Sequence, residues 1–399
     1  MGSFNGLYIG TSGLRTSQNA LNTTAHNLAN VDTKGYVRQQ VVLTDSKYIK
    51  LGENHISSLQ KGLGADFAEV KQVRDMFLDR AYRQEIGRQA FYEAQYEAIG
   101  EIEGLFGELE GVSFQTTMNN FWVSLQELAK EPDNIVARAS FIETAVTFIE
   151  RADTIATQLK KYQINLNSKI NDQVNRINEI GDEIKQLNLK IRMYESNGLE
   201  KANDLRDQRN NLLDELAKMV DISYKEHNNS MVEVSIEGMP FVTEGKVYHM
   251  GTAKVSEGSE MLKPVWLDYG VDVFDFSREI TSENNNDIGS LKGLLLARGD
   301  KQANYTNIPR REDYESDKEF ELATKEYNLT TGASVIMTIQ AQFDQLIHGI
   351  TTILNGVFAP TKEVTLADGS KAIILDDDNA PAGSDPKRTT GEALFIRKS

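Results

Sequence analysis

The five histidines are the residues best suited to acid–base or metal chemistry, and their spacing favours neither. No histidine lies within four residues of another, so the His-Glu-x-x-His pattern of helical zinc proteases is absent. The chain has no cysteine, which excludes disulfides, cysteine-based zinc sites and thiol nucleophiles. It also lacks a Gly-x-Ser-x-Gly elbow. The sequence therefore predicts no catalytic, cofactor-binding or metal site, and no enzyme activity. The histidines are His26, His55, His227, His249 and His348.

Two short motifs could suggest ligands, and a simpler interpretation is better for both. Gly62-Leu63-Gly64 lacks the third glycine of a dinucleotide-binding loop, so we interpret it as a turn. Asp376-Asp377-Asp378-Asn379 lacks the alternating oxygen ligands and the closing glutamate of an EF-hand loop. A solvated acidic turn is the simpler interpretation of that run.

Bulk properties exclude several classes of partner. The chain of 399 residues is long enough for two or three domains, and 40% of it is hydrophobic. Its net charge of −16 argues against a nucleic-acid partner, since such a surface needs clustered Lys and Arg. No segment approaches the ~18 apolar residues of a membrane span. The N-terminus has no basic residue before Arg15 and is interrupted by glycines, so it does not resemble a secretory signal peptide.

A helix is expected from Thr11 to Asn30, with a narrow apolar seam. Its seam residues alternate at spacings of four and three, as in a coiled coil. The remaining surface is polar, so the helix is expected to be disordered or weakly helical in a monomer. Burial between identical subunits is the favoured interpretation of the seam, and Lys34-Gly35 is expected to close the segment. The seam consists of Leu14, Gln18, Leu21, Ala25 and Leu28.

The rest of the chain predicts a mainly α protein with a β-rich domain, α+β and multidomain. Helices are expected over 74–111, 116–130, 134–195, 202–220, 290–297 and 334–358. Short strands are expected over 36–73 and 221–280, and after Pro360, where Asp368-Gly369 would form a hairpin turn. The predicted domains are an N-terminal axial helix (1–35), a β/loop connector (36–73), an antiparallel long-helix bundle (74–220), an outward β-rich domain (221–285), helices returning to the bundle (286–358) with a charged, solvated insertion (299–327), and a β-like end (359–399).

An apolar stripe runs along the second half of the longest predicted helix. It could bind a partner helix, but burial against the chain's own returning helix at 202–220 is favoured. The stripe consists of Ile177, Ile180, Ile184, Leu187, Ile191 and Tyr194.

Several motifs together resemble a known family. Gly10-Thr11-Ser12-Gly13-Leu14, Asn27-Leu28-Ala29-Asn30 and Thr33-Lys34-Gly35-Tyr36 are similar to the N-terminal signature of flagellar rod, hook and hook-associated proteins, the flagellar axial superfamily. The joint spacing of these motifs is specific to that superfamily. Ala202-Asn203-Asp204-Leu205-Arg206-Asp207-Gln208-Arg209 resembles a hallmark of the hook-associated protein 1 family within it.

The resemblance implies a structural subunit joining the flexible hook to the rigid filament, secreted through the flagellar type III export apparatus. It implies three further partners: other copies of the chain in a ring, the hook protein, and hook-associated protein 3. Alternatives are hook-associated protein 3 itself, flagellin or another axial protein of the hook or rod. The expected assembly interface consists of Leu14, Leu21, Ala25, Asn27, Leu28, Asn30, Thr33, Gly35 and Tyr36.

Two features depart from the family pattern. The insertion at 299–327 is longer than in short relatives. The family ends in a C-terminal helix that packs beside the N-terminal helix, and no counterpart is present before Ser399. We therefore expect that the chain is truncated.

Overall fold

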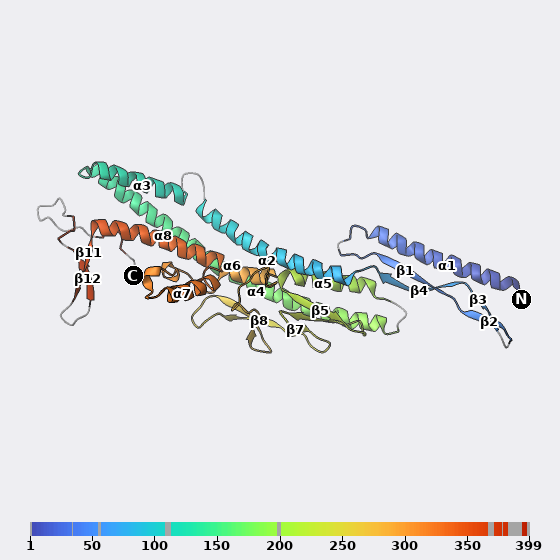
Figure 1. The fold of residues 1–399 in the computed structure, drawn as a ribbon. Helices are drawn as coiled ribbons and strands as arrows, with labels where there is room; N and C mark the ends of the chain where they lie inside the picture. The colour runs from blue at the N-terminus through green and yellow to red at the C-terminus, as the bar shows by residue number, and fades with distance from the viewer. Residues whose placement is uncertain are drawn as a thin grey trace. The chain divides into compact units, whose positions relative to one another are not determined.

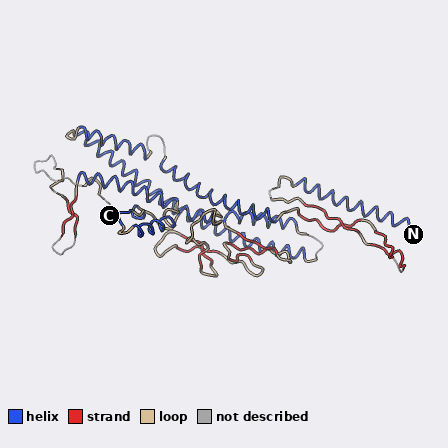
Figure 2. Tube along the Cα trace, in the orientation of Figure 1, coloured by secondary structure: helices blue, strands red, loops and turns tan. Residues whose placement is uncertain are grey.

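The computed structural model describes residues 2–33, 35–54, 57–107, 113–197, 201–365, 371–376, 378–381 and 393–396. These residues are mainly helical, and their strands form small antiparallel sheets (Figure 1, Figure 2). The predicted fold class, mainly α with a β-rich domain, is confirmed.

The element bounds follow the predicted order along the chain. The helices are α1 (Gly2–Ala29), α2 (Met76–Phe106), α3 (Phe114–Lys130), α4 (Ile135–Glu195), α5 (Asn203–Met219), α6 (Ser290–Arg298), α7 (Asp317–Leu329) and α8 (Val335–Phe358), with short 3-10 turns at Tyr305–Asn307 and Arg311–Asp313. The strands are β1 (Gln39–Asp45), β2 (Tyr48–Asn54), β3 (Ser57–Gly62), β4 (Ala65–Gln72), β5 (Ile222–Glu226), β6 (Val232–Ile236), β7 (Met239–Val242), β8 (Met250–Lys254), β9 (Leu262–Trp266), β10 (Val271–Asp272), β11 (Thr361–Thr365) and β12 (Lys371–Leu375).

The chain divides into two compact units. The first comprises 1–94 and 167–295, and the second comprises 95–166 and 296–399. The first unit contains the pairs β1–β4 and β2–β3 and the three-stranded sheets β5–β6–β7 and β10–β9–β8. The second contains α3, α7, α8 and the β11–β12 hairpin. The domain boundaries predicted from composition stay predictions.

In the first unit, three asparagines of α4 fix the β-rich segment to the helix. The Asn188 side-chain amide donates to Val232 O at 2.8 Å, and its oxygen accepts from Val232 N at 3.1 Å. Asn178 makes the same pair of bonds with the backbone of Met250, at 2.8 and 2.9 Å. Asn167 donates to Glu260 O and accepts from Leu262 N. Each amide thus satisfies backbone groups of the strand segments that face the helix.

The apolar stripe of α4 is buried within the chain, as predicted, except at its last residue. Its five aliphatic members are buried, but Tyr194 is exposed. The Phe241 ring of β7 lies against Gly181 in the same part of α4. Any Cβ at position 181 would collide with that ring, so glycine permits the close approach. The buried members are Ile177, Ile180, Ile184, Leu187 and Ile191.

An aromatic cluster forms the core of the second unit. The Phe148 ring lies 5.1 Å from the Phe121 ring and 5.8 Å from the Phe114 ring. Phe343 of α8 packs against Phe106 and Phe114 with ring centroids 5.3 and 5.2 Å apart. These edge-to-face and stacked contacts join α2, α3, α4 and α8.

One helix begins earlier than predicted, and another helix was not predicted. The first helix begins at Gly2 instead of Thr11, because the apolar spacing continues to Leu7 and glycines only modestly oppose a helix that is supported by its neighbours. The charged insertion contains α7, whose first turn is capped by the Ser316 hydroxyl accepting from Glu319 N. Ser-x-x-Glu is a helix-start pattern that the high charge of the insertion obscured. The predicted Asp368-Gly369 turn lies outside the described residues.

Phe148 gives a direct test of the aromatic core. We expect Phe148→Ala to lower the free energy of unfolding by about 3–5 kcal/mol, because the side chain is 0% exposed and its loss leaves a cavity. Ile142→Ala on the same helix, where the side chain is 54% exposed, should change it by less than about 1 kcal/mol. Urea unfolding followed by circular dichroism measures both, and equal effects would contradict the assigned core.

Candidate functional site

The apolar seam of α1 points away from the rest of the described chain. Leu14, Leu21 and Leu28 are 73%, 69% and 74% exposed, and Ala25 and Gln18 between them are also exposed. Because these residues repeat at heptad spacing, they form one continuous stripe on the helix. No described residue covers that stripe, so its burial requires a partner outside the described chain.

The opposite face of α1 packs on the β1–β4 pair through small and polar residues. Thr16 is 5% exposed, and Ser12 lies against Gly64 at the start of β4. The Thr16 hydroxyl donates within its own helix, 3.0 Å from both Ser12 O and Gly13 O, so its burial leaves no unmet hydrogen bond. The helix is therefore held by its polar face while its leucines remain free. Figure 1 shows α1 running alongside β1 and β4.

Asn27 holds the end of α1 to the first strand. Its side-chain oxygen accepts from the Tyr36 hydroxyl at 2.7 Å and from Gln39 N at 2.9 Å. Its side-chain nitrogen donates to Gln39 O at 2.8 Å. The His26 ring contacts the edge of the Tyr36 ring, with centroids 5.5 Å apart. All hydrogen-bonding positions of this amide except one N–H are thus used within the chain.

The remaining signature residues shape the turn after α1. The Asn30 side chain donates to His26 O at 3.0 Å and accepts from the Thr33 hydroxyl at 3.2 Å. Gly35 has a positive φ of 79°, and a Cβ there would collide with the Asn211 side chain of α5. Only glycine meets both conditions. Asn27, Asn30, Thr33, Gly35 and Tyr36, which were predicted for the assembly interface, thus have roles within the chain, and their contact with neighbouring subunits stays a prediction.

Helix α5 anchors this N-terminal arm, defined here as α1 and β1–β4, to the rest of the first unit. The Asp207 carboxylate accepts from Gln72 Nε2 at 2.7 Å and from Val37 N at 3.4 Å. Asn203 donates to Val70 O at 3.0 Å, and its backbone carbonyl accepts from Gln72 Nε2 at 3.0 Å. The residue Val37 before β1 and the end of β4 are therefore both bonded to one turn of α5.

The two arginines of the same block bind in other directions. Arg206 forms two hydrogen bonds of 2.7 Å with the Glu195 carboxylate at the end of α4. Arg209 Nη1 donates to Asn188 Oδ1 at 2.9 Å and to Ser230 O at 2.7 Å. Burial alone would raise the pKa of Glu195, but hydrogen bonds from Arg206, Ser230 and Ala202 N outweigh it and lower that pKa to about 2. Glu195 is therefore ionised at neutral pH.

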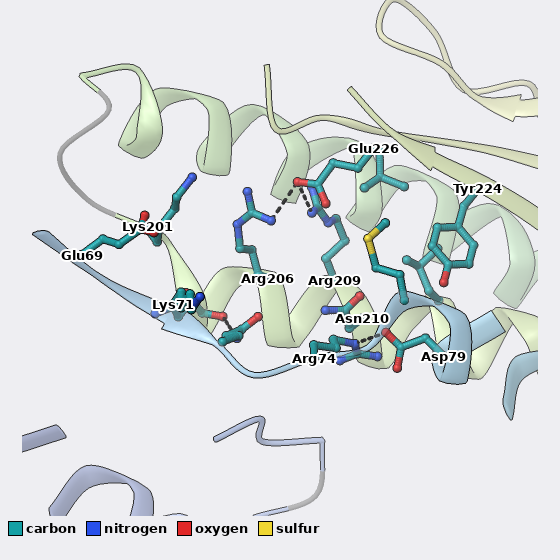
Figure 3. Close-up of a pocket in the computed structure, with 15 residues that line it drawn as sticks. Glu69, Lys71, Arg74, Asp79, Lys201, Arg206, Arg209, Asn210, Tyr224 and Glu226 are labelled. Carbon is teal, nitrogen blue, oxygen red and sulfur yellow. Dashed lines mark hydrogen bonds and ion pairs between the residues drawn. The ribbon is translucent and has the colours of Figure 1, made fainter. Parts of the chain in front are cut away.

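A cavity of about 320 Å³ opens beside this anchor, between β4, α5 and β5 (Figure 3). Arg206 and Arg209 point from α5 toward Glu226 of β5, and Arg74 pairs with Asp79 on the opposite side. Burial lowers the pKa of Arg209 to about 10, which leaves it cationic. The charges are largely paired, so the cavity wall is part of the anchor.

Sequence reasoning marked the α5 block as a family hallmark but missed its role as an anchor. The acid–amide–arginine pattern gave no indication of which partners each side chain would find. In the described part of the chain there is no group of three or more His, Cys, Asp or Glu residues that could hold a metal ion. None of its helices is long and apolar enough to cross a membrane.

Comparisons with known proteins find several similar chains. The chain matches the family model of the flagellar hook-associated protein FlgK helical domain over residues 99–359 and that of the flagella basal body rod protein over residues 7–36. It is similar to flagellar hook-associated protein 1 of Bacillus subtilis (strain 168), with 30% identity covering 74% of this chain and 60% of the relative. Its identity to flagellar hook-associated protein 1 of Salmonella typhimurium is 25%, covering 72% of this chain and 50% of the relative.

One solved structure, described as the flagellar hook junction protein FlgK from Burkholderia pseudomallei, aligns with a TM-score of 0.44 and 21% identity, covering 55% of this chain and 38% of that one. The chain thus spans between about half and three fifths of the length of the two curated relatives.

Asn27 tests the intrachain role of the signature. We expect Asn27→Ala to speed hydrogen exchange at the Gln39 amide by about tenfold, because that amide loses its acceptor. Asn22→Ala, at an exposed position of the same helix, should leave the rate unchanged. Hydrogen exchange can be measured by NMR or mass spectrometry. An unchanged exchange rate at the Gln39 amide in Asn27→Ala would contradict the hydrogen bond between Asn27 and Gln39.

Asp207 gives the anchor a pH dependence. Burial raises the pKa of its carboxyl to about 6, against the hydrogen bonds from Val37 and Gln72. Its contribution to stability is therefore full below its unfolded pKa, near 4, and is lost as pH rises through about 6. We expect the free energy of unfolding of Asp207→Asn to fall less than that of the wild type between pH 4.5 and 7.5, by about 1 kcal/mol.

Urea unfolding at several pH values measures this difference. Asp172→Asn, which removes the same charge from an exposed position on α4, serves as the control and should follow the wild-type profile. Parallel pH profiles for Asp207→Asn and the wild type would show that the carboxyl does not titrate in this range.

Proposed function

Because the chain belongs to the family of the flagellar hook-associated protein FlgK, we propose that it is a structural subunit joining the hook to the filament of the bacterial flagellum. The family consists of structural proteins of the extracellular flagellum, which gives the chain its place outside the cell. The proposed partners are other copies of the chain in a ring, the hook protein and hook-associated protein 3, with passage through the flagellar export apparatus.

The observation that carries this proposal is the exposed leucine stripe of α1. Three leucines at heptad spacing are exposed to water. Full burial of each leucine side chain would lower the free energy by about 1.5–3 kcal/mol, so burial of the stripe is favoured. Its narrow width is typical of helices that pack against other helices. Packing among the α1 helices of neighbouring subunits would bury it.

The polar inner face of α1 supports the same assembly. The hydrogen bonds of Asn27 to Gln39 and those of α5 to the arm fix the arm and involve none of the leucines. The leucines of the seam can therefore pack against neighbouring subunits while the hydrogen bonds within the subunit stay intact. In a dilute monomer, α1 lacks the apolar support that a stable helix needs, so we propose that its ordering is completed on assembly.

The alternatives within the superfamily are less well supported. The match to the FlgK helical domain covers 99–359, which flagellin, hook-associated protein 3 and hook or rod proteins do not explain. We further propose that 36–73 connects the axial helix to the bundle, that the β-rich segment 221–285 faces outward, and that the segment after 358 forms a separate β-like part.

The stripe can be tested in cells whose genomic copy of this gene carries a single substitution. We expect Leu21→Glu to reduce the number of filaments attached to hooks by about tenfold or more, because a charge would be buried between subunits. Thr24→Glu adds the same charge at an exposed position beside the seam and should leave assembly intact. Filaments are counted by electron microscopy of isolated hooks.

Two results would count against the proposal. One is normal filament attachment with Leu21→Glu. The other is a protease-resistant helix over 11–30 in the dilute monomer, since the seam would then be stable without partners. Immunoblots for exported protein separate a failure of export from a failure of assembly.

A further inference from the structure

A second cleft lies on the first unit, and it shares Tyr224 with the cavity beside the anchor. It has a volume of about 600 Å³ and is formed by α2, β5 and the loop before α6. Arg80 and Arg83 line it from α2, and Tyr224 and Lys225 line it from β5. Asp221 is the only acidic residue among the described residues that line it, so cations outnumber anions on its walls.

Arg83 is buried in this cleft with an unused donor. The residue is only 3% exposed, and its Nε donates to Asp214 Oδ1 at 2.7 Å. Its Nη2 lies 3.4 Å from the backbone and side-chain oxygens of Asn210. Its Nη1 has no hydrogen-bond acceptor within the described chain. A buried charged group with an unmet donor is destabilising, so such a donor calls for a ligand.

Tyr224, which lines the same cleft, carries a second unused donor. Its hydroxyl is buried and has no partner among the described residues. The Arg83 guanidinium carbon lies 4.5 Å from the centroid of the Tyr224 ring, and that of Arg80 lies 5.9 Å from it. One aromatic ring is therefore within 6 Å of two guanidinium groups, and its π-face attracts both cations. Arg80 is exposed and makes no hydrogen bond or ion pair within the described residues, which leaves it able to close over a ligand.

We propose that this cleft binds an oxyanion, a carboxylate or phosphate group, through Arg83 Nη1, the Tyr224 hydroxyl and Arg80. An oxyanion supplies several acceptor oxygens to converging donors, and guanidinium groups bind it with charge-assisted hydrogen bonds. The group comes either from a free anion or from an acidic side chain of another copy of this chain, which has 59 acidic residues.

Phosphate titration of the whole chain tests the proposal. The melting temperature of the wild type should rise saturably with inorganic phosphate, and more than with sodium chloride of equal ionic strength. Arg80→Gln and Tyr224→Phe should each weaken the apparent phosphate affinity about tenfold. Lys254→Gln, which removes a cation from the exposed end of β8, should bind phosphate as the wild type does.

Two outcomes would overturn the proposal. In one, phosphate stabilises the wild type no more than chloride does, which would leave ordered water as the partner of the two donors. In the other, Arg80→Gln and Tyr224→Phe bind phosphate as tightly as the wild type, which would place the anion elsewhere. Circular dichroism spectra of both variants confirm that each is folded, and Arg83 is left intact because it holds Asp214.

Sedimentation velocity distinguishes the two sources of the oxyanion. If an acidic side chain of a second copy occupies the cleft, both added phosphate and Arg80→Gln should weaken self-association of the chain. If a free anion is the ligand, phosphate should bind without changing self-association. Either result supports the cleft as an oxyanion site. This proposal does not depend on the role proposed for α1.

Discussion

The structure of the first unit depends on the hydrogen bonds made by the first two turns of α5. Asp207 and Asn203 bind the strands of the N-terminal arm, while Arg206 and Arg209 bind the end of α4 and the loop before β6. These side chains lie within two turns of one helix, so the arm, the long helix and the β-rich segment share a single attachment. The desolvated carboxyl of Asp207 is tolerated because two N–H groups of the arm donate to it.

This attachment explains how α1 can pack on the arm while its leucines stay exposed to water. Helices of globular proteins usually bury their apolar stripe and expose their polar face. In α1 the arrangement is reversed, since Thr16 faces inward and Leu21 faces outward. Hydrogen bonds at Asn27 attach the end of the helix to β1, and those at α5 attach the arm, so neither attachment uses the leucines. The reversal is consistent with a segment whose apolar contacts are made between subunits.

Periodic features were predictable from the sequence, and side-chain partners were not. The heptads of α1 and the stripe from Ile177 to Ile191 depend on local spacing, so their helices and their seams could be predicted. The inward roles of Asn27 and Asn188 could not, because an amide bonds equally well to any backbone it meets in the fold. The cleft around Arg83 and Tyr224 joins residues 141 positions apart, and no local pattern connects them. Helix α7 was not predicted, although the Ser-x-x-Glu pattern that begins at Ser316 is visible in the sequence.

The three asparagines of α4 have a consequence for how this gene can change. Asn167, Asn178 and Asn188 are separated by 11 and 10 residues, or about 15–17 Å along the helix axis. Deleting one residue between two of them would rotate the next amide by about 100° and remove it from its strand. This stretch of α4 therefore admits substitutions but not changes of length. Changes of length are better tolerated in exposed loops, where no helix register fixes a side chain to a strand.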